Sequence, residues 1–230
     1  MASIPYPGLE LKLFEQAHNW KSYWSGRIAP YVRGAVLEVG AGIGANTRLL
    51  SSLDFARWTC LEPDAALAQQ IELPPGGRHE VTLGIMADLP PTQRFHSILY
   101  IDVLEHIEDD AAEMARAAER LEPGGTLIVL SPAHPFLFTP FDEAIGHYRR
   151  YTRSSLRQVA AKGLDEITVT YLDSVGMLAS LGNRLLLGQS MPTARQIGVW
   201  DRWMVPPSRI ADRLTGGYIG KSVLGVWRRE

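Results

Sequence analysis

Apolar runs of strand length recur along the chain, separated by stretches in which apolar residues recur every three or four positions. Short apolar runs of this kind are typical of strands covered on both faces of a parallel sheet. Helical spacing fills the intervals at 45–53, 65–71, 110–121 and 153–161. This alternation predicts an α/β fold. The predicted strands are 36–39, 57–61, 81–84, 95–101, 126–130, 166–172 and 220–227.

Two helical stretches stand outside this alternation. Residues 9–33 precede the first strand and are rich in aromatic side chains, so we expect a helical cap. Residues 174–217 separate the last two strands and hold an apolar helix at 175–187, a polar break at 189–196 and an amphipathic stretch at 197–214. This insertion could roof a pocket, form a homodimer face or rest on a membrane, and we favour the roof. We expect 1–230 to form a single domain.

A glycine-rich turn joins the first strand to the next helix. Gly40, Gly42 and Gly44 let the backbone bend sharply and let a ligand approach closely. The start of the helix offers free N–H groups and a partial positive charge. The spacing departs from the G-x-G-x-x-G dinucleotide fingerprint. Glu38 is also unusual inside a buried parallel strand.

Carboxylates follow the second strand. Glu62 lies about 20 positions after the glycine turn, where a carboxylate is expected to accept hydrogen bonds from ribose hydroxyls. Asp64 suits the N-cap of the helix at 65–71. A nicotinamide-dependent oxidoreductase would share the glycine turn and Glu62, and it is kept as an alternative, although it needs the longer glycine spacing.

Four strings together resemble class I S-adenosylmethionine-dependent methyltransferases: EVGAGIG at 38–44, EP at 62–63, ADL at 87–89 and DVLEHI at 102–107. The loop GHYRRYT at 146–152 is similar to a bacterial type 11/12-like subgroup. The resemblance covers about 18–172 and the last strand. It implies a Rossmann-like, mostly parallel sheet in the order 3-2-1-4-5-7-6, with an antiparallel last strand and helices on both faces.

The resemblance also implies the cofactor, S-adenosyl-L-methionine, and its contacts. Glu38 and the glycine turn would hold its amino-acid end, and Asp88 with the Leu89 amide would bind the adenine. Tyr23 is our candidate for an aromatic contact from the cap. The whole expected cofactor-binding set is Tyr23, Glu38, Gly40, Ala41, Gly42, Gly44, Asn46, Glu62, Pro63, Asp88, Leu89, Asp102 and Val103.

The methyl acceptor should meet the long loop at 131–152, which follows the fifth strand and should overhang the site. His147, Tyr148 and His106 are the catalytic candidates, since histidine titrates near neutrality. A general base is needed only for an acceptor that arrives protonated, and contributes about 10²- to 10⁴-fold. His134, Asp142 and Arg149 are candidates for substrate binding; packing of the aromatics and ion pairing of Arg149 are the structural alternatives.

Composition and missing motifs limit the expected partners, the location and the methyl acceptor. A net charge of −2 gives no electrostatic case for nucleic acid. Neither a secretory signal nor an apolar run of about 20 residues is present, so we expect a cytoplasmic protein without stable membrane insertion. No Cys or His cluster has metal-ligand spacing, and we expect no metal. An NPPY-type string is missing, which argues against nucleobase or glutamine amino groups as targets.

We therefore expect an enzyme that moves a methyl group to an oxygen or nitrogen of a small molecule by in-line displacement. The second alternative is a noncatalytic protein that keeps this fold, with or without cofactor binding, and has no turnover.

Overall fold

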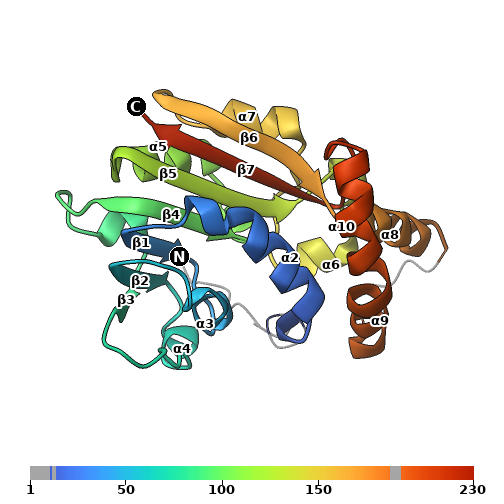
Figure 1. Cartoon of the computed structure of the whole chain (residues 1–230), viewed down its shortest axis with the longest axis horizontal. Coiled ribbons are helices and arrows are strands. Elements are labelled where there is room, and N and C mark those ends of the chain that lie inside the picture. The colour runs from blue at the N-terminus through green and yellow to red at the C-terminus, as the bar shows by residue number, and fades with distance from the viewer. Residues whose placement is uncertain (1–10, 12–13, 187–192) are drawn as a thin grey trace.

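The computed structural model describes residues 11, 14–186 and 193–230. It contains a seven-stranded sheet in the order β3-β2-β1-β4-β5-β7-β6 (Figure 1). β1 to β5 pair in parallel, and β7 runs antiparallel to both of its neighbours. The predicted fold class and strand order are confirmed. The strands are β1 (Ala35–Val39), β2 (Arg57–Glu62), β3 (His79–Leu83), β4 (Phe95–Ile101), β5 (Leu121–Pro132), β6 (Leu164–Leu172) and β7 (Ser222–Arg229).

Helices flank this sheet on both faces (Figure 1). No helix of the described residues is long and apolar enough to cross a membrane. The helices are α2 (His18–Ile28), α3 (Ala45–Leu50), α4 (Ala65–Ala68), α5 (Asp110–Glu119), α6 (Pro140–Ala144), α7 (Arg153–Val159), α8 (Ser174–Leu186), α9 (Ala194–Val199) and α10 (Val205–Leu214).

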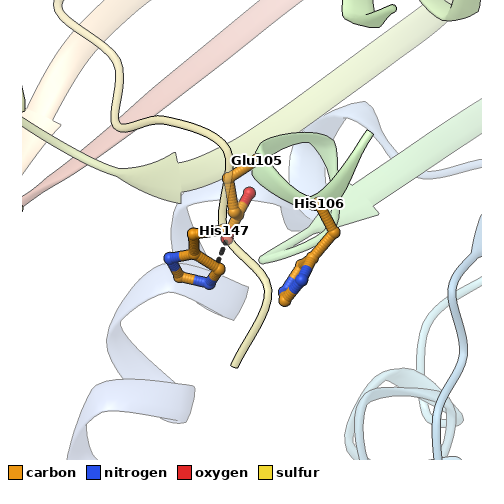
Figure 2. Close-up of side chains that lie close together, drawn as sticks. All are labelled: Glu105, His106 and His147. Carbon is orange, nitrogen blue, oxygen red and sulfur yellow. Dashed lines mark ion pairs between the residues drawn. The ribbon is translucent and has the colours of Figure 1, made fainter. Parts of the chain in front are cut away.

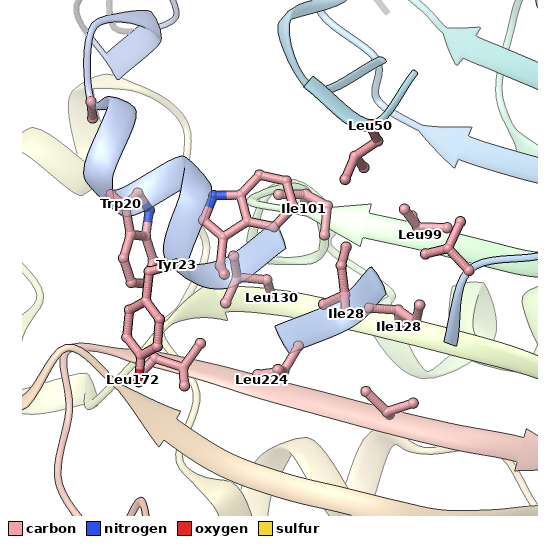
Figure 3. Close-up of a cluster of buried hydrophobic side chains, with 14 of the residues drawn as sticks. Trp20, Tyr23, Ile28, Leu50, Leu99, Ile101, Ile128, Leu130, Leu172 and Leu224 are labelled. Carbon is pink, nitrogen blue, oxygen red and sulfur yellow. The ribbon is translucent and has the colours of Figure 1, made fainter. Parts of the chain in front are cut away.

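Each face of the sheet has its own apolar core. Successive strand residues point to opposite faces, so Leu99 and Tyr100 of β4 belong to different cores. On one face, Trp24 and Ile28 of α2 belong to the same buried cluster as Leu99. Figure 3 shows Ile28 and Leu99 in this cluster. On the other face, Met114 of α5 packs with Tyr100. The apolar runs are continuous because both faces are covered.

The strand order places the carboxyl ends of β2, β1 and β4 side by side. β1 lies between β2 and β4, and all three run in the same direction. The glycine turn follows β1, Glu62 ends β2, and Asp102 follows β4. These groups therefore meet at one edge of the sheet, where ligands of open α/β sheets bind.

The N-terminal helix and the insertion lie together at one end of the sheet (Figure 1). Asp201 in the π-helical segment Trp200–Met204 accepts hydrogen bonds from the backbone N–H groups of Asn19 (3.1 Å) and Trp20 (2.8 Å). These amides belong to the first turn of α2, whose own N-cap residue, Ala17, makes no side-chain capping bond. The insertion thus caps a helix that begins about 180 residues earlier in the chain.

One expected loop contains a helix, and two other expected segments lie partly outside the described residues. In the cap expected at 9–33, residues 11, 14 and 15 are helical, α2 begins at His18 after a break at 16–17, and a 3₁₀ turn follows at Ala29–Tyr31. Residues 1–10 and 12–13 lie outside the described part. Much of the expected polar break, 187–192, also lies outside it. The segment at 131–152, expected as a long loop, contains α6. The Thr139 hydroxyl and backbone N–H both donate to Asp142, an N-terminal cap that loop composition obscured.

Candidate functional site

A cavity of about 870 Å³ opens at the carboxyl ends of the strands. This volume lies within the roughly 300–1,000 Å³ typical of ligand sites. The glycine turn forms one wall, and Trp20, Lys21 and Trp24 of α2 form another. Trp200 and Met204 reach the cavity from the insertion. The insertion therefore contributes side chains to the cavity wall.

The glycine turn has the backbone that only glycine adopts easily. Gly40, Gly42 and Gly44 have φ values of 65°, 57° and 74°. A Cβ on Gly40 would lie 2.7 Å from Val103 Cγ2, so a side chain there would collide with the loop after β4. Predicted residues that line the cavity here are Gly40, Ala41, Gly42, Asn46 and Val103, whereas Gly44 stands at the N-cap of α3.

Glu62 lies in the cavity wall, with Pro63 and Asp64 beside it. Its Oε2 accepts from the Gly42 N–H at 2.7 Å, and its Oε1 accepts from the Asp64 N–H at 3.0 Å. Burial raises the pKa of Glu62, and these two backbone donors oppose the rise. A carboxylate has about four acceptor positions, so Glu62 retains capacity for a ligand's hydroxyl groups.

Glu38 lies behind the glycine turn rather than in the cavity wall. It is 1% exposed and is not part of the cavity lining. Its Oε2 accepts from the Thr47 hydroxyl at 2.5 Å and from Trp58 Nε1 at 2.9 Å, which ties β1 to α3 and β2. Burial raises the pKa of Glu38 to about 7.

Tyr23, Asp88 and Leu89 also lie outside the cavity lining. The Tyr23 hydroxyl donates to Asp212 Oδ2 at 2.8 Å, because helical spacing turns position 23 toward α10 while positions 20, 21 and 24 face the cavity. Asp88 is exposed and accepts from the Ile85 N–H at 2.9 Å, while Leu89 is buried. The structure therefore places Trp20 or Trp24, rather than Tyr23, where an aromatic contact from the cap could be made.

Asp102 faces the cavity directly after β4, in the left-handed backbone region (φ 55°). Its backbone N–H donates to the Leu130 carbonyl at 2.8 Å, which fixes the turn. The side chain is open to the cavity yet surrounded by protein. Burial raises its pKa to about 6, against the opposing charges of His147 and Lys221.

Three polar side chains converge in the wall of the cavity (Figure 2). Glu105 and His106 belong to the 3₁₀ turn Leu104–His106, and His147 comes from the segment after α6. His147 Nε2 lies 3.9 Å from Glu105 Oε1, and the two imidazole rings meet at 82° with centroids 4.5 Å apart. Burial lowers the pKa of His106 to about 4. Burial, and after it the charge of Asp102, raise the pKa of Glu105.

The Asp142 carboxylate binds the His147 nitrogen that points away from Glu105. His147 Nδ1 lies 2.9 Å from Asp142 Oδ1, and Arg150 donates from Nε and Nη2 to the same carboxylate at 2.7 and 2.8 Å. Burial opposes ionisation of Asp142, but the hydrogen bonds from His147 and Arg150 outweigh it and hold the pKa below its usual range. An ionised carboxylate only accepts, so His147 Nδ1 carries a proton and donates to Asp142. In the neutral imidazole, Nε2 is then the nitrogen with the lone pair, on the side where Glu105 lies.

Three other predicted acceptor residues lie outside the cavity lining. Tyr148 is 54% exposed. Arg149 pairs with Asp110 of α5 at 2.5 Å, as the ion-pair alternative expected. The His134 ring lies 3.0 Å from the Gly220 carbonyl and packs against Tyr171. Only His106, Asp142 and His147 of the acceptor candidates reach the cavity.

Several lining residues escaped the sequence analysis. Glu105 lay inside the recognised DVLEHI string but was not singled out, although it is fully buried next to His106. Lys221 precedes β7, and its Nζ lies 3.4 Å from the Trp200 ring centroid and 3.6 Å from Asp173. No local pattern marks Lys221, because its neighbours lie at positions 173 and 200, far from it in the sequence.

The sheet order, the glycine turn and the cavity at the strand ends define a class I methyltransferase fold. The Methyltransferase domain family matches residues 16–164, and the chain belongs to that family. Demethylmenaquinone methyltransferase of Tropheryma whipplei (strain Twist) is 30% identical over 155 residues, which is 66% of this chain. The match spans 62% of that relative's length.

Solved structures share the fold at low sequence identity. One is a putative methyltransferase of Haloferax volcanii in complex with the Trm112 methyltransferase activator (TM-score 0.62, 17% identity, 96% of this chain and 92% of that chain). Another is the N-methyltransferase NodS of Bradyrhizobium japonicum with S-adenosyl-L-homocysteine (TM-score 0.60, 15% identity, 97% of each chain). A third is phosphoethanolamine N-methyltransferase 2 of Haemonchus contortus (TM-score 0.64, 14% identity, 98% of this chain and 58% of that chain).

Proposed function

We propose that this protein transfers a methyl group from S-adenosylmethionine to an oxygen or nitrogen of a small molecule. One observation carries the proposal: the buried Glu62 carboxylate lies in the cavity wall, bound to the Gly42 N–H of the glycine turn. This pairing of an acidic strand end with a glycine turn suits a ligand that has a ribose. The structure of NodS with S-adenosyl-L-homocysteine supports the same kind of ligand.

The residues around the cavity fit such a cofactor. Glu62 has acceptor capacity for ribose hydroxyls, and the backbone at Gly40–Gly42 lets a ligand approach without a Cβ in its way. Asp102 can attract the positively charged amino group. For the adenine, we propose the segment at 85–89. This segment follows β3, which pairs with the strand that ends at Glu62, and Asp88 within it is exposed.

The acceptor would lie against His147. When bound, S-adenosylmethionine supplies its sulfonium methyl group: the acceptor's lone pair forms the new bond to carbon as the carbon–sulfur bond breaks. His147 Nε2, with Nδ1–H held by ionised Asp142, can take a proton from the acceptor's O–H or N–H. Glu105 and His106 complete this wall of the cavity.

Aromatic and apolar side chains shape the remaining volume. Trp20, Trp24 and Trp200 line the cavity together with Phe141 and Leu137. These walls exclude water and favour an acceptor with an apolar or ring-bearing part. In such a pocket the enzyme's main task is to align the acceptor with the methyl group. The low charge of the chain favours a small molecule over nucleic acid.

Calorimetry tests the cofactor. We expect S-adenosylhomocysteine to bind and NADH not to bind; the reverse result would favour the oxidoreductase. A methyl-transfer screen against pooled metabolites, which measures formation of S-adenosylhomocysteine, then tests catalysis. Binding without turnover across such pools would favour the noncatalytic alternative.

A further inference from the structure

We propose that Glu105, His106 and His147 bind a divalent transition-metal ion in the wall of the cavity (Figure 2). One ligand atom from each residue lies within 4.8 Å of the other two. Residues 105 and 106 follow β4, whereas His147 comes from the segment after α6. Sequence spacing could not reveal this group, because the fold brings its third member from about 40 residues away.

Glu105 is suited to a cation because one of its oxygens lacks a partner. Its side chain is fully buried, and Oε2 accepts from the Ser131 hydroxyl at 2.9 Å. Oε1 is buried and accepts no hydrogen bond among the described residues. A buried carboxylate oxygen left unpaired is costly, and coordination to a metal ion would satisfy it.

His147 is already oriented as a ligand. The hydrogen bond of 2.9 Å between Nδ1 and Asp142 leaves the Nε2 lone pair directed to the side where Glu105 Oε1 lies 3.9 Å away. Asp142 is itself fixed by Arg150 and Thr139. A carboxylate that accepts from the far nitrogen of a histidine is the usual outer support of a metal ligand, since it fixes both tautomer and ring orientation.

The ligand types indicate which ions fit. Two imidazole nitrogens and one carboxylate suit Zn²⁺ or Fe²⁺ better than Mg²⁺, which prefers oxygen ligands. Three protein ligands leave coordination positions unfilled, and all three residues line the cavity. Those positions would face the space in which we place the acceptor.

This inference rests on the proposed function for the acceptor's location. A bound ion would orient an oxygen or nitrogen donor of the acceptor. His147 Nε2 would then hold the ion, and the base role proposed above would apply only to the metal-free protein.

The test uses the full chain, stripped with a chelator, and metal alone. Titration with Co²⁺ should produce visible d–d absorption bands of a protein-bound ion at a ratio of one per chain, and calorimetry should detect Zn²⁺ binding. Asp142→Asn, which removes the outer support, should weaken Zn²⁺ binding about 10- to 100-fold. His147→Ala and Glu105→Gln, which remove ligands, should weaken it at least as much. His18→Ala removes an exposed histidine outside the cavity and should leave the affinity unchanged.

Circular dichroism of every variant shows whether it is folded; if Glu105→Gln is not, His147→Ala and His106→Ala decide the result. Absent d–d bands, or equal Zn²⁺ affinity in wild type and the ligand variants, would overturn the metal site. S-adenosylhomocysteine titration of the same stripped samples keeps the two proposals apart. Cofactor binding without metal binding overturns only this inference, whereas metal binding without cofactor binding overturns only the proposed function.

Discussion

At the scale of single residues, the buried glutamates differ in their hydrogen-bond partners and in their position relative to the cavity. Glu38, Glu62 and Glu105 are each less than 5% exposed, yet their partners differ. Glu38 bonds to side chains of α3 and β2, Glu62 bonds to backbone amides at the cavity, and Glu105 bonds to Ser131. Glu38 and Glu105 each keep one oxygen unpaired, but only Glu105 of these two lines the cavity. Residue type alone therefore does not fix the role of an acidic position.

Glu62→Ala should weaken S-adenosylhomocysteine binding by about 1–3 kcal/mol, because ligand hydroxyls and the Gly42 amide would lose their acceptor. Calorimetry measures the change. Glu72→Ala is the matched control, since Glu72 is exposed and outside the cavity lining. An unchanged dissociation constant in Glu62→Ala would remove the ribose role.

Asp102 should make cofactor affinity depend on pH. Its pKa of about 6 means that the carboxylate becomes neutral as the pH falls through that value, and it then loses its attraction for an ammonium group. We expect S-adenosylhomocysteine to bind more weakly at pH 5 than at pH 7, by up to about tenfold per pH unit below the pKa. Asp102→Asn should bind weakly at both pH values; a pH dependence equal to that of wild type would exclude Asp102 as its source.

Glu38 should affect folding stability instead. Burial raises its pKa from 4.5 to about 7, so the native chain binds more protons than the unfolded chain between these values. The free energy of unfolding should therefore fall as the pH rises through this window, by up to roughly 3 kcal/mol from this group. Urea unfolding at pH 4.5, 6 and 8 measures it. Glu38→Gln should be less pH-dependent than wild type, and identical slopes would contradict the assignment.

At the scale of elements, sequence patterns located the strands well and the helix ends less well. The range 95–101 matches β4, whereas the helix expected at 45–53 ends at Leu50. Strand runs are fixed by burial on both faces, which the hydrophobic pattern records directly. Helix ends depend on caps, and the cap of α2 comes from Asp201, too far along the chain for any local pattern to show.

Asp201→Ala should lower the free energy of unfolding by about 1–3 kcal/mol, because two amides in the first turn of α2 would lose their buried acceptor. Asp201→Asn keeps one acceptor oxygen and should have an intermediate effect. Urea denaturation compares the three proteins. Equal stability of Asp201→Ala and wild type would show that water replaces the carboxylate without cost.

At the scale of the whole molecule, the resemblance predicted the sheet order, and the glycine turn and Glu62 were correctly expected at one edge. The cavity wall formed by Lys221, Trp200 and Glu105 was not predicted. Its members come from segments that meet only after folding, so no spacing rule connects them. The sequence also does not show which aromatic side chains of α2 face the cavity, because this depends on how the helix packs. We chose Tyr23, whereas Trp20 and Trp24 line the cavity.

Cofactor binding should stabilise the entire chain. At a ligand concentration of 100 times the dissociation constant, S-adenosylhomocysteine should add about 2.7 kcal/mol. For a chain of this size the melting temperature should rise by roughly 5–11 °C. Differential scanning fluorimetry should show the same rise in His147→Ala and a smaller rise in Glu62→Ala at equal ligand concentration. A smaller rise in His147→Ala than in wild type would place His147 at the cofactor.

The hydrogen bonds from α2 to Asp201 have a consequence for exchanging parts between homologues. The Asp201 carboxylate belongs to the insertion between β6 and β7, yet it caps α2, which precedes the sheet. The insertion and α2 therefore depend on each other. A chimaera that imports either of them alone would bring in a helix without its cap or a charge without its donors. Grafts meant to alter acceptor choice should therefore carry both segments from the same donor protein.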